Sequence, residues 1–232
     1  MRNKEDRENR YEVLHGNDFT IAELDEVIAL DRMSLDSCYQ VTASDDYALF
    51  KSNPENGLIV RERATKKIVG YSMLLPIREE MYERIRTGTF IDTDFTPDMT
   101  FRYDEPGIYR LYFASVVVHP DHRGAAMVLT MLDAMVKDFI DLTSRGIFFE
   151  SMIADVVSRD GIKFCKLFGL KEVCRSNHNS YIYEVTTLPP LLRVTTPTTK
   201  RLYDIYRAKF ADEYGDEADF LGERIYDAIE EK

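Results

Sequence analysis

Arg123 and Gly124 stand between an apolar run and a helical pattern, and this junction is the part of the chain best suited to bind an anion. Residues 111–118 predict a buried strand, and residues 119–122 predict a sharp turn after it. The residues after Arg123 are small or apolar, so the first turn of the next helix leaves backbone N–H groups free. Free N–H groups and the helix dipole both favour phosphate. We therefore expect a phosphate-bearing ligand here.

A carboxylate that suits proton transfer occurs in the next apolar run. Glu150 lies among Phe149, Met152 and other apolar residues of the segment 147–154. Apolar surroundings favour the protonated form of a carboxyl group, which is what a general base near neutral pH requires. The alternative is that Glu150 faces solvent or pairs with a cation on a helix.

A long acidic loop at residues 91–108 precedes the predicted strand at 109–118. Its carboxylates, Asp92, Asp94, Asp104 and Glu105, can hold an ammonium group or can simply be solvated. Structureless loops of this length in compact domains are often functional or mobile.

Composition narrows the classes of partner. The chain has 232 residues, 44% of them hydrophobic, and a formal net charge of -11, which argues against nucleic acid as a partner and suits an amine-bearing substrate. The apolar runs are too short to span a bilayer, and residues 1–10 form a charge run unlike a signal peptide, so we expect a cytoplasmic protein with no membrane partner. Cys38, Cys165 and Cys174 have no CxxC spacing, so we expect neither a disulfide framework nor a metal site.

The order of predicted elements indicates a mixed-sheet α/β or α+β domain. We expect a flexible N-terminus over 1–10, one domain over 11–190 and a C-terminal helical extension over 191–232. Thr20 and Glu23 have the spacing of a capping box at the first helix. The expected strands cover 11–15, 57–63, 68–77, 109–118, 147–154, 170–175 and 181–185; the expected helices begin near Thr20 and cover 44–52, 78–90, 124–144 and 158–168.

Two amphipathic patterns follow a Thr- and Pro-rich linker at 186–199. The first places Leu202, Ile205, Tyr206 and Phe210 on one helical face, and the second does the same for Phe220, Leu221, Ile225, Tyr226 and Ile229. Such faces either pack back on their own domain or form a dimer contact, so a homodimer is possible.

Two segments give the chain a family resemblance. Residues 118–124 and residues 163–173, the latter ending in Gly-Leu-Lys-Glu-Val, lie about forty residues apart in the order found in the GNAT superfamily of acyl-CoA N-acyltransferases. Residues 11–186 resemble this family. The resemblance implies a GNAT-like mixed, mostly antiparallel central sheet flanked by helices.

The resemblance also implies coenzyme A, as acetyl-CoA, for a co-substrate. It places the pyrophosphate cradle at Arg123, Gly124, Ala125, Ala126, Met127 and Val128. The family pattern has glycine at the position of Ala126 and glycine or alanine at that of Val128, and the larger Val128 crowds the cradle. The pantetheine arm would lie between splayed parallel strands and pair with the backbone of Val116, Val117 and Val118. Ser158, where the family often has asparagine, would bond this arm or cap its own helix.

In the family, an amine attacks the thioester directly. This requires a base, an oxyanion donor and an acid for the departing thiolate. Backbone N–H groups of residues 116–118 would serve the oxyanion, and Tyr112 and Ser115 would line the acceptor site. Cys165 stands where the family often has its acidic tyrosine; it is either that acid or a small buried hydrophobe. Tyr181 and Tyr183 are alternatives for the acid.

The resemblance therefore predicts acetyl transfer to a primary amine of a small molecule or peptide. One alternative is a GNAT-like domain that binds or senses coenzyme A without turnover. Another is an acyltransferase that uses longer acyl chains or an acyl carrier protein. Motifs of serine hydrolases, phosphate-loop enzymes and dinucleotide-binding folds are missing from the sequence.

Overall fold

The computed structural model describes residues 10–34, 43–91, 95–167, 169–186 and 196–214. Cys38, Asp92, Asp94 and the second predicted tail helix lie outside these ranges. The strands are β1 (Tyr11–His15), β2 (Gly57–Glu62), β3 (Ile68–Ile77), β4 (Gly107–Val118), β5 (Ile147–Val156), β6 (Lys171–Arg175) and β7 (Tyr181–Val185). The α-helices are α2 (Ile21–Ser34), α3 (Ala43–Ser52), α4 (Glu79–Arg86), α5 (Ala125–Ser144), α6 (Arg159–Leu167) and α7 (Pro197–Tyr214).

One seven-stranded sheet organises the chain, with the strand order β1-β2-β3-β4-β5-β7-β6. Every neighbouring pair is antiparallel except β4 and β5, which run parallel. The predicted fold class, a mixed and mostly antiparallel sheet flanked by helices, is confirmed. The single parallel pair follows from the long crossover through α5, which a tight hairpin cannot replace.

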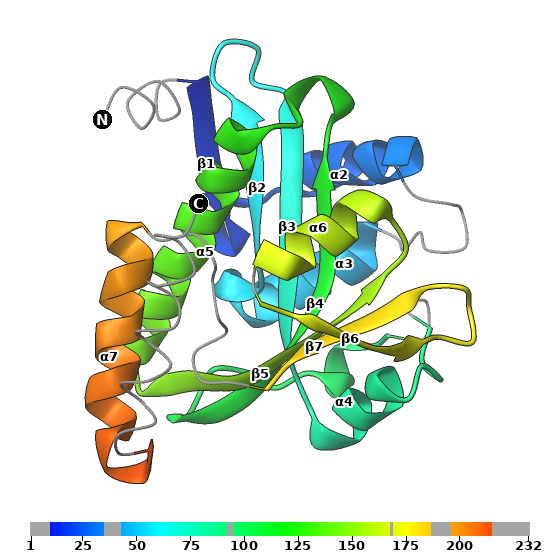
Figure 1. Cartoon of the computed structure of the whole chain (residues 1–232). Helices are drawn as coiled ribbons and strands as arrows, with labels where there is room; N and C mark the ends of the chain where they lie inside the picture. The colour runs from blue at the N-terminus through cyan, green and yellow to red at the C-terminus, as the bar shows by residue number, and fades with distance from the viewer. Residues whose placement is uncertain (1–9, 35–42, 92–94, 168, 187–195, 215–232) are drawn as a thin grey trace, which may run out of the picture.

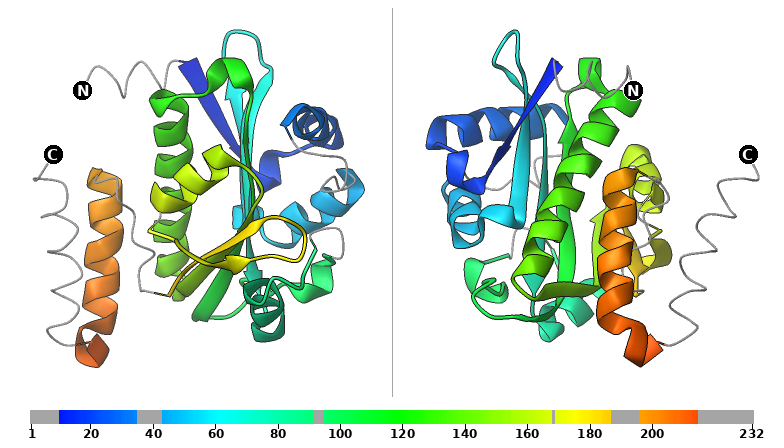
Figure 2. Two further views of the ribbon diagram at one scale, coloured as in Figure 1. Left: turned by 45° about the vertical axis from the view of Figure 1, so that its right-hand side comes forward. Right: turned by 90° about the vertical axis from the view of Figure 1, so that its left-hand side faces the viewer.

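Helices cover both faces of the sheet (Figures 1 and 2). One face, here called the α5 face, packs Leu111, Met152 and their neighbours against α5, α6 and α7. The other, here called the α2 face, packs Tyr71, Ile153 and their neighbours against α2, α3 and α4. Successive residues of a strand point to opposite faces of the sheet, so neighbouring residues of one strand belong to different cores.

Local signals explain several boundaries. The capping box before α2 is confirmed, because the Thr20 N–H donates to Glu23 Oε2 at 2.7 Å and the Glu23 N–H donates to Thr20 Oγ1 at 3.4 Å. All ten residues of β3 are buried, as its central place in the sheet requires. Helix α4 ends at Arg86, earlier than predicted, and Gly88 with a φ of 68° makes the turn that follows.

The first tail helix packs back on the domain, as one of the two interpretations held. Leu202, Tyr206 and Phe210 are buried against α5 and β5. The predicted linker is wrong at its C-terminal end, because α7 begins at Pro197. The Thr196 hydroxyl accepts the Thr199 N–H at 3.1 Å, and Pro197 suits the first helical position, where no N–H is needed.

The loop before β4 is also more ordered than predicted. It contains a 3₁₀ turn, Pro97–Met99, and Thr100 bridges to Ile77 of β3. The Asn53 side chain accepts the Tyr103 N–H at 2.8 Å and donates to the Phe101 carbonyl at 2.9 Å. These bonds hold the described part of the loop against the domain.

Candidate functional site

The parallel strands β4 and β5 separate along their length, and a cleft opens between them. Their pairing ends at Tyr112 and Ile153. On its other edge β5 pairs with β7 from Met152 to Val156. Within the described chain, residues 113–118 of β4 have no strand partner on the side of β5. The cleft is lined by Phe113, Ala114, Ser115, Val116, Val117, Ala154, Asp155, Val156, Val157, Ser158, Gly161 and Cys165.

A bulge interrupts β4 where this strand lines the cleft. Met73 of β3 pairs with Ser115 and Leu74 pairs with Phe113, so Ala114 is an extra residue. Of the predicted pantetheine-binding residues, Val116 and Val117 line the cleft, whereas Val118 lies beyond it. The unpaired edge of β4 supplies backbone groups that an extended chain with amide groups can bond.

The start of α5 lies at one end of β4 and is open. Gly124 is the N-cap with a φ of 155°, and no described atom lies within 4 Å of where a Cβ would be. The first turn begins with the bond from the Val128 N–H to the Gly124 carbonyl, at 3.1 Å. By helix geometry the N–H groups of Ala125, Ala126 and Met127 precede that bond and have no partner within the helix.

The substituted cradle positions differ in their packing. Ala126 is exposed, so it adds only a methyl group to the open side. Val128 is partly buried and packs against the core of the α5 face. The Met127 side chain is buried, so this residue can contribute only its backbone N–H. The cradle thus keeps the features that favour a diphosphate despite the missing glycines.

Arg123 joins the end of β4 to the start of α6. Its Nε donates to the Val118 carbonyl at 3.3 Å, and its Nη1 lies 3.6 Å from Asp160 Oδ2 on α6. A hydrogen bond from Lys163 is the main cause that lowers the pKa of Asp160, and the charge of Arg123 adds to it. The guanidinium is half-exposed, which leaves it accessible to an anion.

Ser158 caps α6. Its Oγ accepts the Gly161 N–H at 3.0 Å, and its carbonyl accepts the Ile162 N–H at 3.0 Å. The helix-cap interpretation is confirmed. Ser158 also lines the cleft, so its predicted contact with the pantetheine arm stays a prediction.

Cys165 lines the cleft from α6 and is buried. Burial raises the pKa of this thiol to about 12. A thiol held so strongly in its protonated form is a poor proton donor to a departing thiolate. The packing of its neighbour Phe164 on Phe113, with ring centroids 5.6 Å apart, fits the interpretation as a core residue.

Glu150 and Tyr181 do not line the cleft. The predicted apolar surroundings of Glu150 are wrong, because its Oε1 accepts the Arg110 Nε–H at 2.7 Å and its side chain is 40% exposed. The cause is a bulge: Tyr109 pairs with Phe149 and Arg110 with Ser151, so Glu150 is the extra residue. The Tyr181 ring packs under the Arg175 guanidinium at 6.0 Å.

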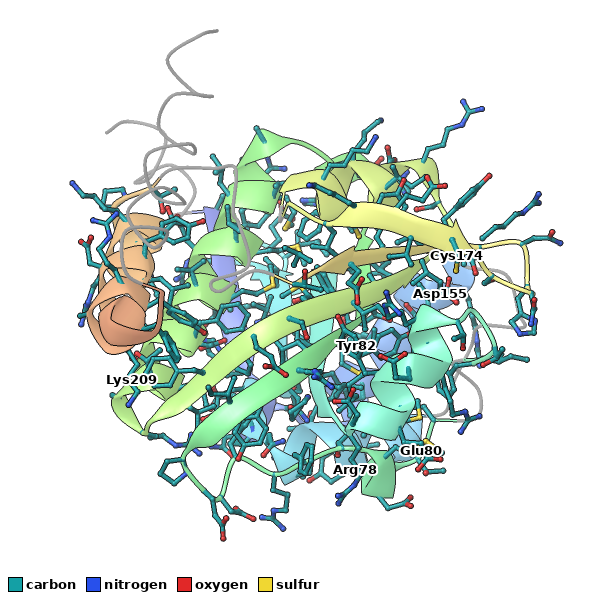
Figure 3. The ribbon with its side chains drawn as sticks, turned by 60° about the horizontal axis from the view of Figure 1, so that its bottom comes forward. Arg78, Glu80, Tyr82, Asp155, Cys174 and Lys209 are labelled. Atoms are coloured by element: carbon teal, nitrogen blue, oxygen red, sulfur yellow. The ribbon has the colours of Figure 1, made fainter. Side chains whose placement is uncertain are left out.

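Asp155 lines the cleft and was missed by sequence reasoning. It lies two residues after Ile153 in β5, on the same α2 face, and pairs with Ile182 of that same core. In Figure 3 it lies near the end of β5, beyond Tyr82 of α4. The strand was predicted to end at Ala154, so a carboxylate inside the strand was not expected.

The electrostatic setting of Asp155 is unusual for a surface carboxylate. Burial raises the pKa of Asp155, and a hydrogen bond from the Ser180 side chain, the charge of His178 and a hydrogen bond from the Val156 backbone partly offset this rise. Its Oδ1 is buried, and no donor in the described residues reaches it. The combination marks a carboxyl group that is poised for proton exchange or for a cation.

The α2 face beside the cleft has an aromatic wall. Tyr112 is buried there, stacked on Phe95 with centroids 6.1 Å apart and packed edge-on against Phe90. Ser115 lines the cleft, and its predicted role in an acceptor site stays a prediction. Asp104 instead forms an exposed ion pair with Arg102 at 3.2 Å, which agrees with the solvated interpretation of the acidic loop.

Two features are absent from the described residues. None of their His, Cys, Asp and Glu side chains gather in threes in a way that could hold a metal ion. None of their helices combines the length and the apolar character that crossing a bilayer demands.

Comparison with known proteins identifies the fold. No protein-family model matches the sequence, and neither does any curated protein. Among solved structures, the loading GNATL domain of CurA from Lyngbya majuscula is 14% identical, with a TM-score of 0.53 over 76% of this chain and 97% of that one. The GphF GNAT-like decarboxylase in complex with isobutyryl-CoA is 10% identical, with a TM-score of 0.55 over 75% and 98%.

A third structure, the NatC complex bound to Gag peptide and CoA, is 9% identical, with a TM-score of 0.50 over 78% of this chain and 99% of that one. The chain therefore has the fold of the GNAT superfamily of acyl-CoA N-acyltransferases. At these identities the likeness concerns the fold, and the chemistry rests on the residues of the site.

Proposed function

We propose that the chain is an acyl-CoA-dependent N-acyltransferase that transfers an acetyl group from acetyl-CoA to a primary amine. The observation that carries the proposal is the continuity between the unpaired edge of β4, the cleft and the open start of α5. An extended acyl-pantetheine arm matches the first two features, and a diphosphate matches the third.

The residues suit the individual tasks. Arg123 and the N–H groups of Ala125, Ala126 and Met127 hold the diphosphate. The backbone of Val116 and Val117 bonds the pantetheine arm, and Ser158 lies along its path. A backbone N–H of this strand serves the oxyanion of the tetrahedral intermediate.

The acceptor is an amine of a small molecule or a peptide. Support comes from the acidic composition, with a net charge of -11, and from the half-buried carboxylate of Asp155 in the cleft, whose Oδ1 is buried. We propose no nucleic-acid partner.

Binding and turnover together test the proposal. Calorimetry with acetyl-CoA measures the dissociation constant, and a thiol-release assay across primary amines and short peptides measures transfer. We expect micromolar binding and amine-dependent thiol release. Absence of binding at millimolar acetyl-CoA refutes the proposal.

A second candidate, a domain that binds coenzyme A without N-acyl transfer, is favoured by one observation. Cys165 stands where the family often has a tyrosine, and its raised pKa of about 12 leaves the thiolate without a good donor there. The GNAT-like decarboxylase among the structural neighbours illustrates that this fold also hosts other thioester chemistry. Tight binding with no thiol release across all amines and peptides would favour this candidate.

A further inference from the structure

We infer that Asp155 binds the ammonium group of the acceptor and takes up its proton, an inference that rests on the proposed function. The residue that the sequence suggested as a base, Glu150, does not line the cleft. Asp155 has an ionisable carboxylate and does line the cleft.

The position of Asp155 gives the direction of approach. Asp155 pairs with Ile182 of β7, and Ile182 pairs in turn with Cys174 of β6. All three residues lie on the α2 face. Cys165, by contrast, belongs to the core of the α5 face. The cleft thus connects the two faces, and Asp155 stands on the face opposite to α6. An acceptor that enters from the α2 face meets Asp155 before it reaches the edge of β4.

The unsatisfied oxygen of Asp155 gives the chemical reason. A buried carboxylate oxygen without a donor costs free energy, and a cation that arrives with the substrate removes that cost. The neighbouring groups offset the burial of the carboxylate only in part. His178 is the ionisable side chain that lowers its pKa, and Ser180 contributes a neutral hydroxyl. A primary ammonium has the charge and the donors that would satisfy the Oδ1 atom.

The acceptor nitrogen loses two protons in the reaction, one to Asp155 and one to the departing thiolate. The acceptor ammonium gives one proton to the Asp155 carboxylate, and the neutral amine then attacks the carbonyl carbon of the thioester. A C–N bond forms, the C–S bond breaks, and sulfur keeps the bonding pair. The second nitrogen proton passes to this thiolate, which leaves as a free thiol. Asp155 then releases its proton to solvent.

The Asp155→Asn variant tests the inference, with Asp204→Asn as the matched control on the exposed side of α7. For Asp155→Asn we expect kcat/KM to fall at least about a hundredfold at pH 7, while the acetyl-CoA dissociation constant stays within threefold. The deficit should shrink as the pH approaches the pKa of the amine, because the amine then arrives without its proton. The control should keep wild-type turnover.

Three outcomes overturn the inference: turnover of Asp155→Asn within threefold of the wild type, a deficit that does not change with pH, or a loss of acetyl-CoA binding together with turnover. Failure of the proposed function is distinguishable, because in that case the wild type itself does not bind acetyl-CoA or release thiol.

A second variant leaves Asp155 in place. Ser180→Ala removes the hydroxyl that lowers the pKa of Asp155, so the acid limb of the kcat/KM profile should move to higher pH. An acid limb that does not move would contradict the role of Asp155, even if Asp155→Asn failed to fold.

Discussion

Asp155 and Cys165 line one cleft from opposite faces of the central sheet. Asp155 lies on the same face of β5 as Ile153, the face beneath α2, whereas Cys165 belongs to the core beneath α5. The cleft therefore passes between β4 and β5 and reaches both helical layers. This relationship separates the two substrates of a transfer reaction: a cofactor arm can enter along α5 and α6 while an acceptor enters from the other side.

The first prediction concerns the cradle at the start of α5. Replacement of Arg123 by Glu places a negative charge beside the site of the diphosphate, and we expect acetyl-CoA affinity to fall at least tenfold, about 1.4 kcal/mol or more. Calorimetry measures the change. Arg201→Glu, on the exposed surface of α7, makes the same charge change away from the site and should bind normally. An unchanged dissociation constant in Arg123→Glu would remove the argued site.

The second prediction concerns the thiol in the cleft. Because burial raises the pKa of Cys165 to about 12, we expect it to pack rather than to donate a proton. Cys165→Ala should keep kcat within tenfold of the wild type and lower the free energy of unfolding by about 1 kcal/mol. Steady-state kinetics and denaturant unfolding measure both. A hundredfold loss of kcat at unchanged KM would restore the acid role of this cysteine.

The third prediction concerns the pH dependence of stability. Asp31 is 3% exposed, and burial raises its pKa to about 6, although a 2.6 Å hydrogen bond from the Tyr71 hydroxyl partly offsets this. The unfolded chain has an ordinary aspartate pKa of about 3.9, so the folded state holds this proton more tightly and loses stability as the pH rises from about 4 to about 6.

The Asp31→Asn variant lacks this titration. From pH 4 to pH 7 its free energy of unfolding should rise by roughly 2–3 kcal/mol relative to that of the wild type. Urea unfolding at a series of pH values measures the difference, and Asp25→Asn, exposed on the same helix, is the control. Parallel pH profiles for Asp31→Asn and the wild type would show that Asp31 titrates normally.

The fourth prediction concerns the C-terminal helix. The Tyr206 hydroxyl accepts the N–H of Phe149 at 2.9 Å, in the buried contact between α7 and β5. Tyr206→Phe leaves that N–H without its partner and should cost about 1–3 kcal/mol of unfolding free energy. Lys209→Ala, which removes an exposed cation 5.9 Å from the Phe148 ring, should cost about 1 kcal/mol at most. Equal losses in the two variants would mean that the bond contributes little.

The sequence was sufficient for most of the elements because their signals are local. The capping pair Thr20 and Glu23 marked the start of α2, and the apolar run of β3 marked a central strand. The error at Pro197 has a local cause too: threonines and a proline that form a helix cap have the same composition as a linker. The loop before β4 was misjudged because its order depends on Asn53, which is distant in sequence.

The candidate site was harder to predict, since two bulges decide which side chains face where. The extra residue at Glu150 places this carboxylate beside Arg110 and away from the cleft. Neither bulge has a glycine or other sequence mark, and both arise from the register of three strands. Asp155 became visible only when the pairing of β5 with β7 extended the strand past Ala154.

Because of the bulge at Ala114, the orientation of the side chains in the site depends on the number of residues in β4. With this residue in place, Val116 packs toward α5 and Val117 toward α2. Deletion of Ala114 alone would exchange the two orientations for the rest of β4, because side chains alternate with a period of two. Homologous chains that keep the cleft are thus expected to tolerate substitution at this position far better than a change in the number of residues.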